Sequence, residues 1–105
     1  MSSKKKILVV CSSGMSTSLL VKAMRKAADK EGYEVEISSA PIVGAEDLMP
    51  ETDAVLVGPQ MRHRFEEIER IFAVADVPAK LVPPQVYGLM DGKAALEIAK
   101  KMIME

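Results

Sequence analysis

The chain has 105 residues, with 14 Lys and Arg against 15 Asp and Glu, and its formal net charge is −1 at pH 7. This length supports one ordinary hydrophobic core, so we expect a single domain over residues 1–105. The balanced charge, with aromatic residues at only 4%, argues against a nucleic-acid partner. One cysteine and one histidine exclude an internal disulfide and provide no cluster of metal ligands. We therefore expect a cytoplasmic protein that uses no metal or other cofactor.

The first residues have a faint likeness to a signal peptide. Lysines at positions 4–6 precede an apolar run at 7–10, which is shorter than the roughly 7–15 apolar residues that such a peptide needs. No other segment approaches the length of a membrane span, so we expect no stable membrane insertion. The lysines are better explained as the solvated start of a strand.

Four segments predict the strands of a parallel sheet. Residues 7–10 and 54–57 are continuous apolar runs, typical of central strands that are covered on both faces. Residues 33–37 and 79–82 mix charged with apolar side chains, which indicates strands with less complete cover. We expect the first pair at the centre of the sheet and the second pair at its edges.

Apolar stripes with helical spacing alternate with these strands. The first runs through residues 20–27 and stops before Gly32, a predicted helix C-terminus. The second covers 61–72, and the third, over 95–102, has Asp91 as its predicted cap. Alternating strands and helices imply right-handed crossovers, so the sequence predicts a parallel sheet of order 2-1-3-4 in a three-layer, flavodoxin-like α/β sandwich.

The binding edge of such a sheet follows from its topology. Ligands bind beyond the carboxyl ends of the strands, at the switch point between the first and third strands. Residues 11–18 and 58–60 follow those two strands, and 83–88 follow the fourth, so all three segments are expected at one edge. The segment from Pro41 to Pro50 gives the weakest signal, and we predict a short helix there that carries Leu48.

The only cysteine, Cys11, lies between the first strand and the first helix, in a loop of small residues, CSSGMSTSLL. A helix start offers unpaired N–H groups and the positive end of the helix dipole, which favour a thiolate and a phosphate group alike. Gly14 lets the backbone turn without a Cβ clash, so successive amides can converge on a tetrahedral oxyanion. Small hydroxyl side chains are present at Ser12, Ser13, Ser16, Thr17 and Ser18. The alternative is a buried structural cysteine followed by a serine N-cap.

Three motifs in one register resemble a known family. CSSGMSTSLL after the first strand, GPQ after the third and VYGLMDG after the fourth are similar to the free-standing enzyme IIB of the lactose/cellobiose/chitobiose class of the bacterial sugar phosphotransferase system. The resemblance covers nearly the whole chain. It implies a phosphoryl carrier, in which a phosphohistidine of enzyme IIA donates to a cysteine that then passes the group to a sugar held by membrane enzyme IIC.

Carried over to this chain, the resemblance implies that Cys11 is the phosphocysteine. Residues 12–18 would form the phosphate-binding loop, which includes Gly14 and Met15. The sugar would be a β-linked disaccharide such as cellobiose or chitobiose. The protein would be a monomer that is cytoplasmic and transiently at the inner face of the cell membrane.

Low-molecular-weight tyrosine phosphatases have a similar strand, loop and helix, but their signature places Arg where this chain has Thr17. No Lys or Arg occurs from 11 to 21, so a phosphoryl group held by this loop alone would be under-neutralised, which suits a relay. The only candidate general acid near the rim is Asp91, which is better explained as a helix cap. A Cys-dependent phosphatase or arsenate-reductase-like enzyme stays the alternative, and an anion-binding module with an inert cysteine comes third.

Three more residues have two explanations each. Gln60 either offers hydrogen bonds at the switch point or is a polar loop residue that begins a helix. Tyr87 either brings its hydroxyl near the loop or packs in the core. His63, flanked by two arginines, is expected at an exposed helix position rather than as a phosphoryl carrier itself.

Overall fold

Four parallel strands, β1 (Lys5–Cys11), β2 (Val35–Pro41), β3 (Ala54–Val57) and β4 (Ala79–Leu81), form one sheet in the order β2-β1-β3-β4. The computed structural model describes residues 4–11, 14–42 and 52–104, with side chains throughout except at 14–16. The predicted strand order and all-parallel pairing are confirmed. The continuous apolar runs of β1 and β3 are central and buried, as their sequence indicates.

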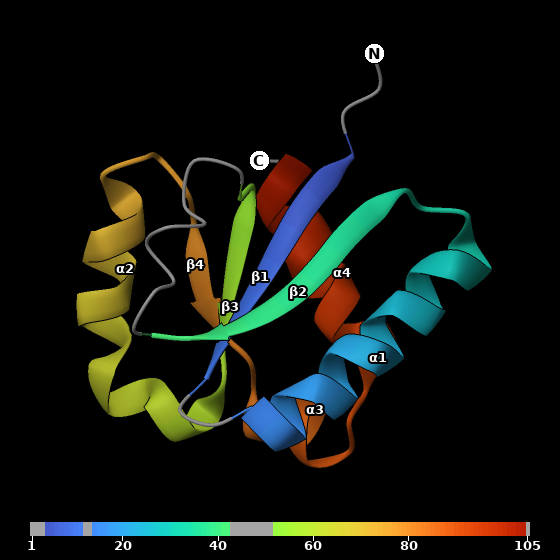
Figure 1. Cartoon of the computed structure of the whole chain (residues 1–105), viewed down its shortest axis with the longest axis horizontal. Helices are drawn as coiled ribbons and strands as arrows, with labels where there is room; N and C mark the ends of the chain where they lie inside the picture. The colour runs from blue at the N-terminus through green and yellow to red at the C-terminus, as the bar shows by residue number, and fades with distance from the viewer. Residues whose placement is uncertain (1–3, 12–13, 43–51, 105) are drawn as a thin grey trace.

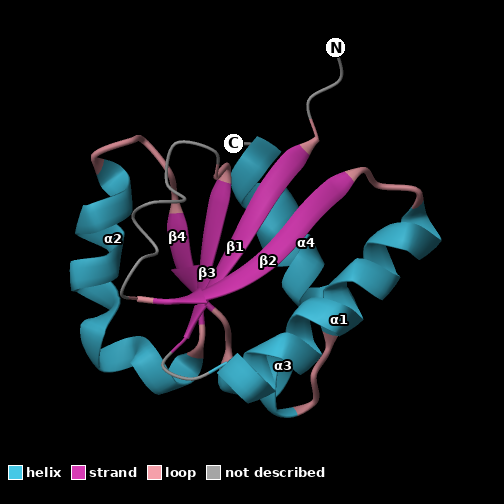
Figure 2. Cartoon of the chain, viewed as in Figure 1, coloured by secondary structure: helices cyan, strands magenta, loops and turns pink. Residues whose placement is uncertain are grey.

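Helices cover both faces of the sheet (Figure 1; Figure 2). On one face lie α1 (Gly14–Glu31), α3 (Pro84–Gly88) and α4 (Gly92–Met104), and on the other lie the 3₁₀ helix η2 (Pro59–Arg64) and α2 (Phe65–Ala73). Ile7 and Val9 pack in the cluster with α1 and α4, whereas Leu8 packs with α2. Because neighbouring strand residues point to opposite faces, β1 supplies both halves of the core in the predicted three-layer sandwich.

The predicted boundaries of the first edge strand are wrong by a few residues. Tyr33 lies before β2, and the strand continues to Pro41 instead of ending at Ile37. Gly32 has φ +68°, and the N–H of Tyr33 donates to the carbonyl of Ala28 at 3.0 Å. The predicted stop at Gly32 is therefore confirmed, and it draws Tyr33 into the closing turn of α1.

The predicted helix over 61–72 consists of two helices. Arg64 has φ −115° and ψ 11°, outside the α-helical region, and it separates the 3₁₀ turns of η2 from α2. Apolar residues three or four apart fit a short 3₁₀ helix as well as an α-helix, so their spacing could not reveal the break. Of the weakly predicted segment, Pro41 ends β2, and Leu48 lies outside the described residues.

The carboxyl end of the molecule packs closely against α1. The carboxylate Oδ1 of Asp91 accepts a hydrogen bond from the N–H of Ala94 at 3.1 Å, which confirms Asp91 as the cap of α4. A Cβ at Gly92 would overlap the backbone of Ala23 in α1. The absence of a side chain at Gly92 thus lets the two helices approach each other and hold α3 at the edge of the sheet.

Candidate functional site

Cys11 is the last residue of β1, buried at 1% exposure. We predicted it within a loop, but it pairs with Pro41 of β2 and so still belongs to the sheet. The last pair between the two central strands is Val10 with Val57, and the N–H of Gly58 donates to the carbonyl of Val10 at 2.9 Å. Cys11 therefore lies immediately past the point where β1 and β3 end together, which is the switch point of the sheet.

The segments that follow β1, β3 and β4 gather at one edge of the sheet. The start of α1, the 3₁₀ helix η2 and the short helix α3 lie along the lower edge in Figure 1. We predicted residues 83–88 at this rim without assigning a helix, and Pro84 at its first turn begins the five-residue α3 there. This edge is the one at which an open α/β sheet binds its ligands.

The predicted phosphate-binding loop is described in part. Ser12 and Ser13 lie outside the described residues, and only the backbone of Gly14, Met15 and Ser16 is described. Thr17 and Ser18 belong to α1, which begins at Gly14 directly after the cysteine segment. Thr17 is fully buried, although a threonine in the first turns of a helix is commonly exposed.

The hydroxyl of Tyr87 explains why Thr17 is buried. Tyr87 Oη lies 3.4 Å from Thr17 Oγ1, a long separation for two hydroxyls, and it accepts a hydrogen bond from Gln60 Nε2 at 2.9 Å. Tyr87 itself is 9% exposed and packs in the core with α1 and α4. Both explanations offered for Tyr87 hold at once, because its ring packs while its hydroxyl joins α1 to η2.

Gly58 keeps Gln60 in this position. A Cβ at Gly58 would lie 2.5 Å from Gln60 Oε1, too close for any real contact. A side chain there would displace the amide that donates to Tyr87. Gln60 lines the pocket with Cys11 and donates to Tyr87, and its site-facing role stays a prediction.

A pocket of about 390 Å³ adjoins Cys11. Seven residues line it: Cys11, Pro41, Ile42, Gln60, Met61, His63 and Arg64. His63 is exposed, as predicted, yet it also lines this pocket. The loop and the start of the first helix contain no cation over residues 11–21, so the sequence analysis did not include Arg64, which the fold brings to the pocket from η2. Its position soon after the GPQ motif at the switch point was the available signal.

Arg64 is paired at the rim of this pocket. Its Nε donates to Glu67 Oε1 at 3.0 Å and its Nη2 donates to Glu67 Oε2 at 3.1 Å. The hydrogen bond to Arg64 lowers the pKa of Glu67, and the same bond raises the pKa of Arg64. Both side chains are more than one-third exposed, at 41% and 47%, so solvent screens the pair and it contributes little to stability.

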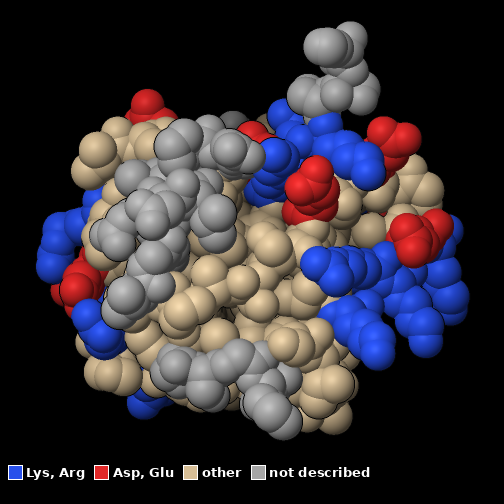
Figure 3. Space-filling model, viewed as in Figure 1, with Lys and Arg blue, Asp and Glu red and all other residues tan. Residues whose placement is uncertain are grey.

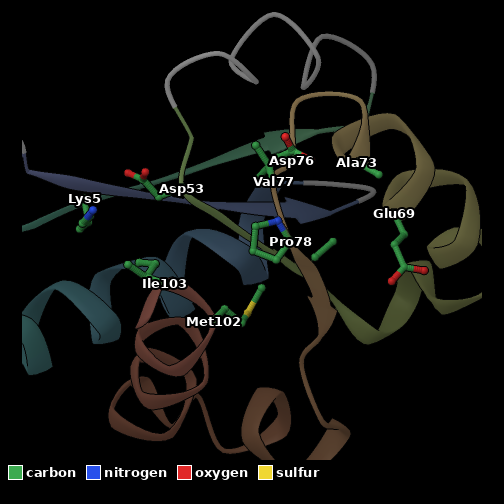
Figure 4. Close-up of a pocket in the computed structure, with 10 residues that line it drawn as sticks. Lys5, Asp53, Glu69, Ala73, Asp76, Val77, Pro78, Met102 and Ile103 are labelled. Atoms are coloured by element: carbon green, nitrogen blue, oxygen red, sulfur yellow. The ribbon is translucent and has the colours of Figure 1, made fainter. Parts of the chain in front are cut away.

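A larger pocket, of about 570 Å³, lies at the opposite end of the sheet (Figure 4). Its lining includes Lys5, Asp53, Glu69 and Asp76. Asp53 Oδ2 accepts from the N–H of Lys6 at 2.8 Å, so its carboxylate connects the segment before β3 to β1. By size this pocket would be the candidate binding site. By its chemistry the smaller pocket is the better candidate, because it holds the cysteine at the switch point.

Basic side chains are concentrated on the surface of one helix. Lys and Arg gather over α1 in Figure 3, where Lys22, Arg25, Lys26 and Lys30 are exposed. Among the described residues, no three His, Cys, Asp or Glu side chains come together in a way that could hold a metal ion. None of the helices within 4–11, 14–42 and 52–104 is long and apolar enough to cross a membrane.

The sequence matches a known family model and curated proteins over nearly its whole length. The model described as PTS system, Lactose/Cellobiose specific IIB subunit matches residues 6–98. An oligo-beta-mannoside-specific EIIB component from Bacillus subtilis is 40% identical over 100 residues, which are 95% of this chain and 97% of that protein. A lactose-specific EIICB component from Staphylococcus epidermidis is 34% identical over 104 residues, which are 95% of this chain but 18% of the longer protein.

Two solved structures share the fold. The lactose-specific IIB domain from Streptococcus pneumoniae matches with a TM-score of 0.84 at 19% identity, over 94% of this chain and 97% of that one. The cellobiose-specific IIB component from Borrelia burgdorferi matches with a TM-score of 0.81 at 29% identity, over 95% of this chain and 92% of that one. Both likenesses span the sheet and the helices on both of its faces.

Proposed function

Because the chain belongs to the lactose/cellobiose-specific IIB family of the phosphotransferase system, we propose that Cys11 is the residue on which it carries the phosphoryl group. Proteins of this family are phosphotransferase components of sugar transport. The observation that carries the proposal is the position of the chain's only cysteine, at the end of β1, at the switch point and directly before α1. The amino end of a long helix favours both a thiolate and a phosphoryl group bound to it.

The transfer consists of two displacements at phosphorus. In the first, the Cys11 thiolate attacks a phosphohistidine of enzyme IIA, an S–P bond forms, the N–P bond breaks, and the imidazole nitrogen keeps the electron pair. In the second, a sugar hydroxyl oxygen attacks the same phosphorus, the S–P bond breaks, the thiolate is regenerated and the hydroxyl proton is released. The loop over residues 12–18 would bind the phosphoryl oxygens between the two steps.

The partners are a phosphorylated enzyme IIA and the membrane enzyme IIC with its bound sugar. Relatives named EIICB support the second partner, because their printed name joins the IIC and IIB parts in one protein. On this basis the chain works as a monomeric, phosphocysteine-carrying IIB domain in the cytoplasm and visits the inner face of the cell membrane. The sugar is a β-linked disaccharide such as cellobiose or chitobiose, and names that include oligo-beta-mannoside and cellobiose support this class.

Two observations disfavour the phosphatase alternative. Thr17, which stands where the phosphatase signature has its arginine, is fully buried beside Tyr87. Asp91, the candidate general acid, uses Oδ1 to cap α4. The arginine of the phosphatase signature is thus missing from its position in the loop, and the candidate acid is already hydrogen-bonded.

The test is Cys11→Ser. Oxygen replaces sulfur with little change in volume, but the serine hydroxyl stays protonated near pH 7, so the nucleophile is lost while the fold is kept. We expect labelling from a phosphoenolpyruvate-driven relay to disappear, with a melting temperature like that of the wild type. Label that persists in a folded Cys11→Ser protein would place the acceptor at another residue.

A further inference from the structure

The pocket beside Cys11 contains a basic side chain that the loop lacks. Residues 11 to 21 hold no Lys or Arg, yet Arg64 of η2 lines the same pocket as Cys11. Among the described residues, the other titratable side chains here are His63, which lines the pocket from the same helix, and Glu67 of α2, which pairs with Arg64. The β2 side contributes Pro41 and Ile42, which carry no charge.

Arg64 can exchange Glu67 for a phosphoryl group, which is the stronger hydrogen-bond partner. The pair between Arg64 and Glu67 is exposed and screened, so little is lost when it opens. A phosphoryl group carries a charge of about −1.5 to −2 and three acceptor oxygens, against one charge on Glu67. The planar fork of an arginine can bind a phosphate through two parallel hydrogen bonds, as it binds Glu67 here, so the larger charge of the phosphoryl group favours the exchange.

We infer that Arg64 is a phosphoryl-binding side chain of this protein: Glu67 holds its guanidinium at the pocket rim, and the phosphorylated cysteine draws it inward. The inference rests on the proposed function, because it requires the phosphoryl group to be on Cys11. It revises the expectation of an under-neutralised adduct. The positive charge comes from η2, because residues 11–21 contain no Lys or Arg.

Arg62 provides a matched control. It belongs to the same 3₁₀ helix and carries the same charge, but it is exposed and does not line the pocket. Arg62→Gln and Arg64→Gln thus remove one positive charge each from neighbouring positions. If the phosphoryl group responds only to the overall electrostatic field of the protein, the two substitutions change it alike. If Arg64 binds the phosphoryl group directly, only Arg64→Gln changes it.

The first measurement follows the arginine Nε–Hε resonances by NMR in the wild-type protein. We expect the Arg64 resonance to shift when Cys11 is phosphorylated by the relay, while the Arg62 resonance stays in place. If the protein is labelled and the Arg64 resonance does not move, this inference fails and the proposed function stands. If the wild type takes no label at Cys11, the proposed function fails and this inference with it.

The second measurement is a ³¹P titration of the phosphorylated protein. A cation on the phosphoryl group favours its dianion, so we expect Arg64→Gln to raise the midpoint of its last ionisation by about half a pH unit. Arg62→Gln should change it by no more than about 0.1. His63, which also lines the pocket, is unchanged in both variants. Equal shifts in the two variants, or none, would refute direct binding by Arg64.

Discussion

The two ends of the sheet hold pockets of opposite chemical character. The larger one, at the amino ends of the strands, has acidic side chains, and Asp53 there accepts a hydrogen bond from the backbone of Lys6. The smaller one, at the carboxyl ends, has the only cysteine together with an amide, an imidazole and a guanidinium. The parallel arrangement explains the difference, because the strands deliver their following segments and helix starts to one edge only. Volume alone would favour the amino end.

The largest expected effect concerns whether the carboxyl-end pocket carries phosphoryl groups or hydrolyses them. Asp91, the candidate acid near the rim, is engaged as a helix cap and is not positioned to serve water at the S–P bond. We expect isolated phospho-Cys11 to be lost in buffer at least about a hundredfold more slowly than on return to dephosphorylated enzyme IIA. Cleavage by iodine identifies the S–P bond before the rates are compared. Equal rates of loss in buffer and on return to enzyme IIA, or efficient turnover of an aryl phosphate, would show that the protein is a phosphatase and not a phosphoryl carrier.

A smaller loss of transfer is expected when the hydroxyl that joins α1 to η2 is removed. Tyr87→Phe leaves Gln60 Nε2 without its acceptor and Thr17 Oγ1 without its neighbour. We expect phosphoryl acceptance from enzyme IIA to fall roughly tenfold, which corresponds to about one hydrogen bond. Tyr33→Phe is the control, since it removes the other tyrosine hydroxyl far from this edge, where the ring lies 5.0 Å from Lys100 Nζ. Equal rates in the two variants would show that the hydroxyl of Tyr87 has no part in the site.

The amino-end pocket should respond to mutation in the opposite way. Asp53→Ala removes the acceptor of the Lys6 N–H at a partly buried position, so we expect a loss of about 1 kcal/mol in the free energy of unfolding. Phosphoryl transfer should stay at the wild-type rate. Glu69→Ala, an exposed change in the lining of the same pocket, serves as the control for stability. A transfer defect in folded Asp53→Ala protein would show that the amino-end pocket also takes part in phosphoryl transfer.

The smallest effect is a dependence of stability on pH at the rim of the Cys11 pocket. Arg64 lowers the pKa of Glu67 in the folded protein, so their pair stabilises the fold above the unfolded pKa of Glu67. That contribution is lost as the pH falls through the lowered, folded pKa. We expect Glu67→Gln to melt slightly below the wild type at pH 7 and together with it at strongly acidic pH. A difference that grows on acidification would contradict the sign of this linkage.

The sequence by itself determined the sheet and the position of its only cysteine. Continuous apolar runs place β1 and β3 at the centre, because a strand covered on both faces has no polar side. Gly32 and Asp91 mark helix ends through local backbone and capping chemistry, which needs no distant partner. From these elements alone, Cys11 is predicted to lie at the switch point.

Only the tertiary structure decided what surrounds that cysteine. The fold places the Tyr87 hydroxyl beside Thr17 and Gln60. It also brings Arg64 to the Cys11 pocket, whose own loop has no basic residue. Contacts of this kind depend on where the helices lie on the sheet, so the sequence offers Gln60 and Tyr87 only as alternatives and Arg64 only through its position after the GPQ motif. The 3₁₀ turns of η2 show the same limit, since residues spaced three or four apart fit either kind of helix until packing selects one.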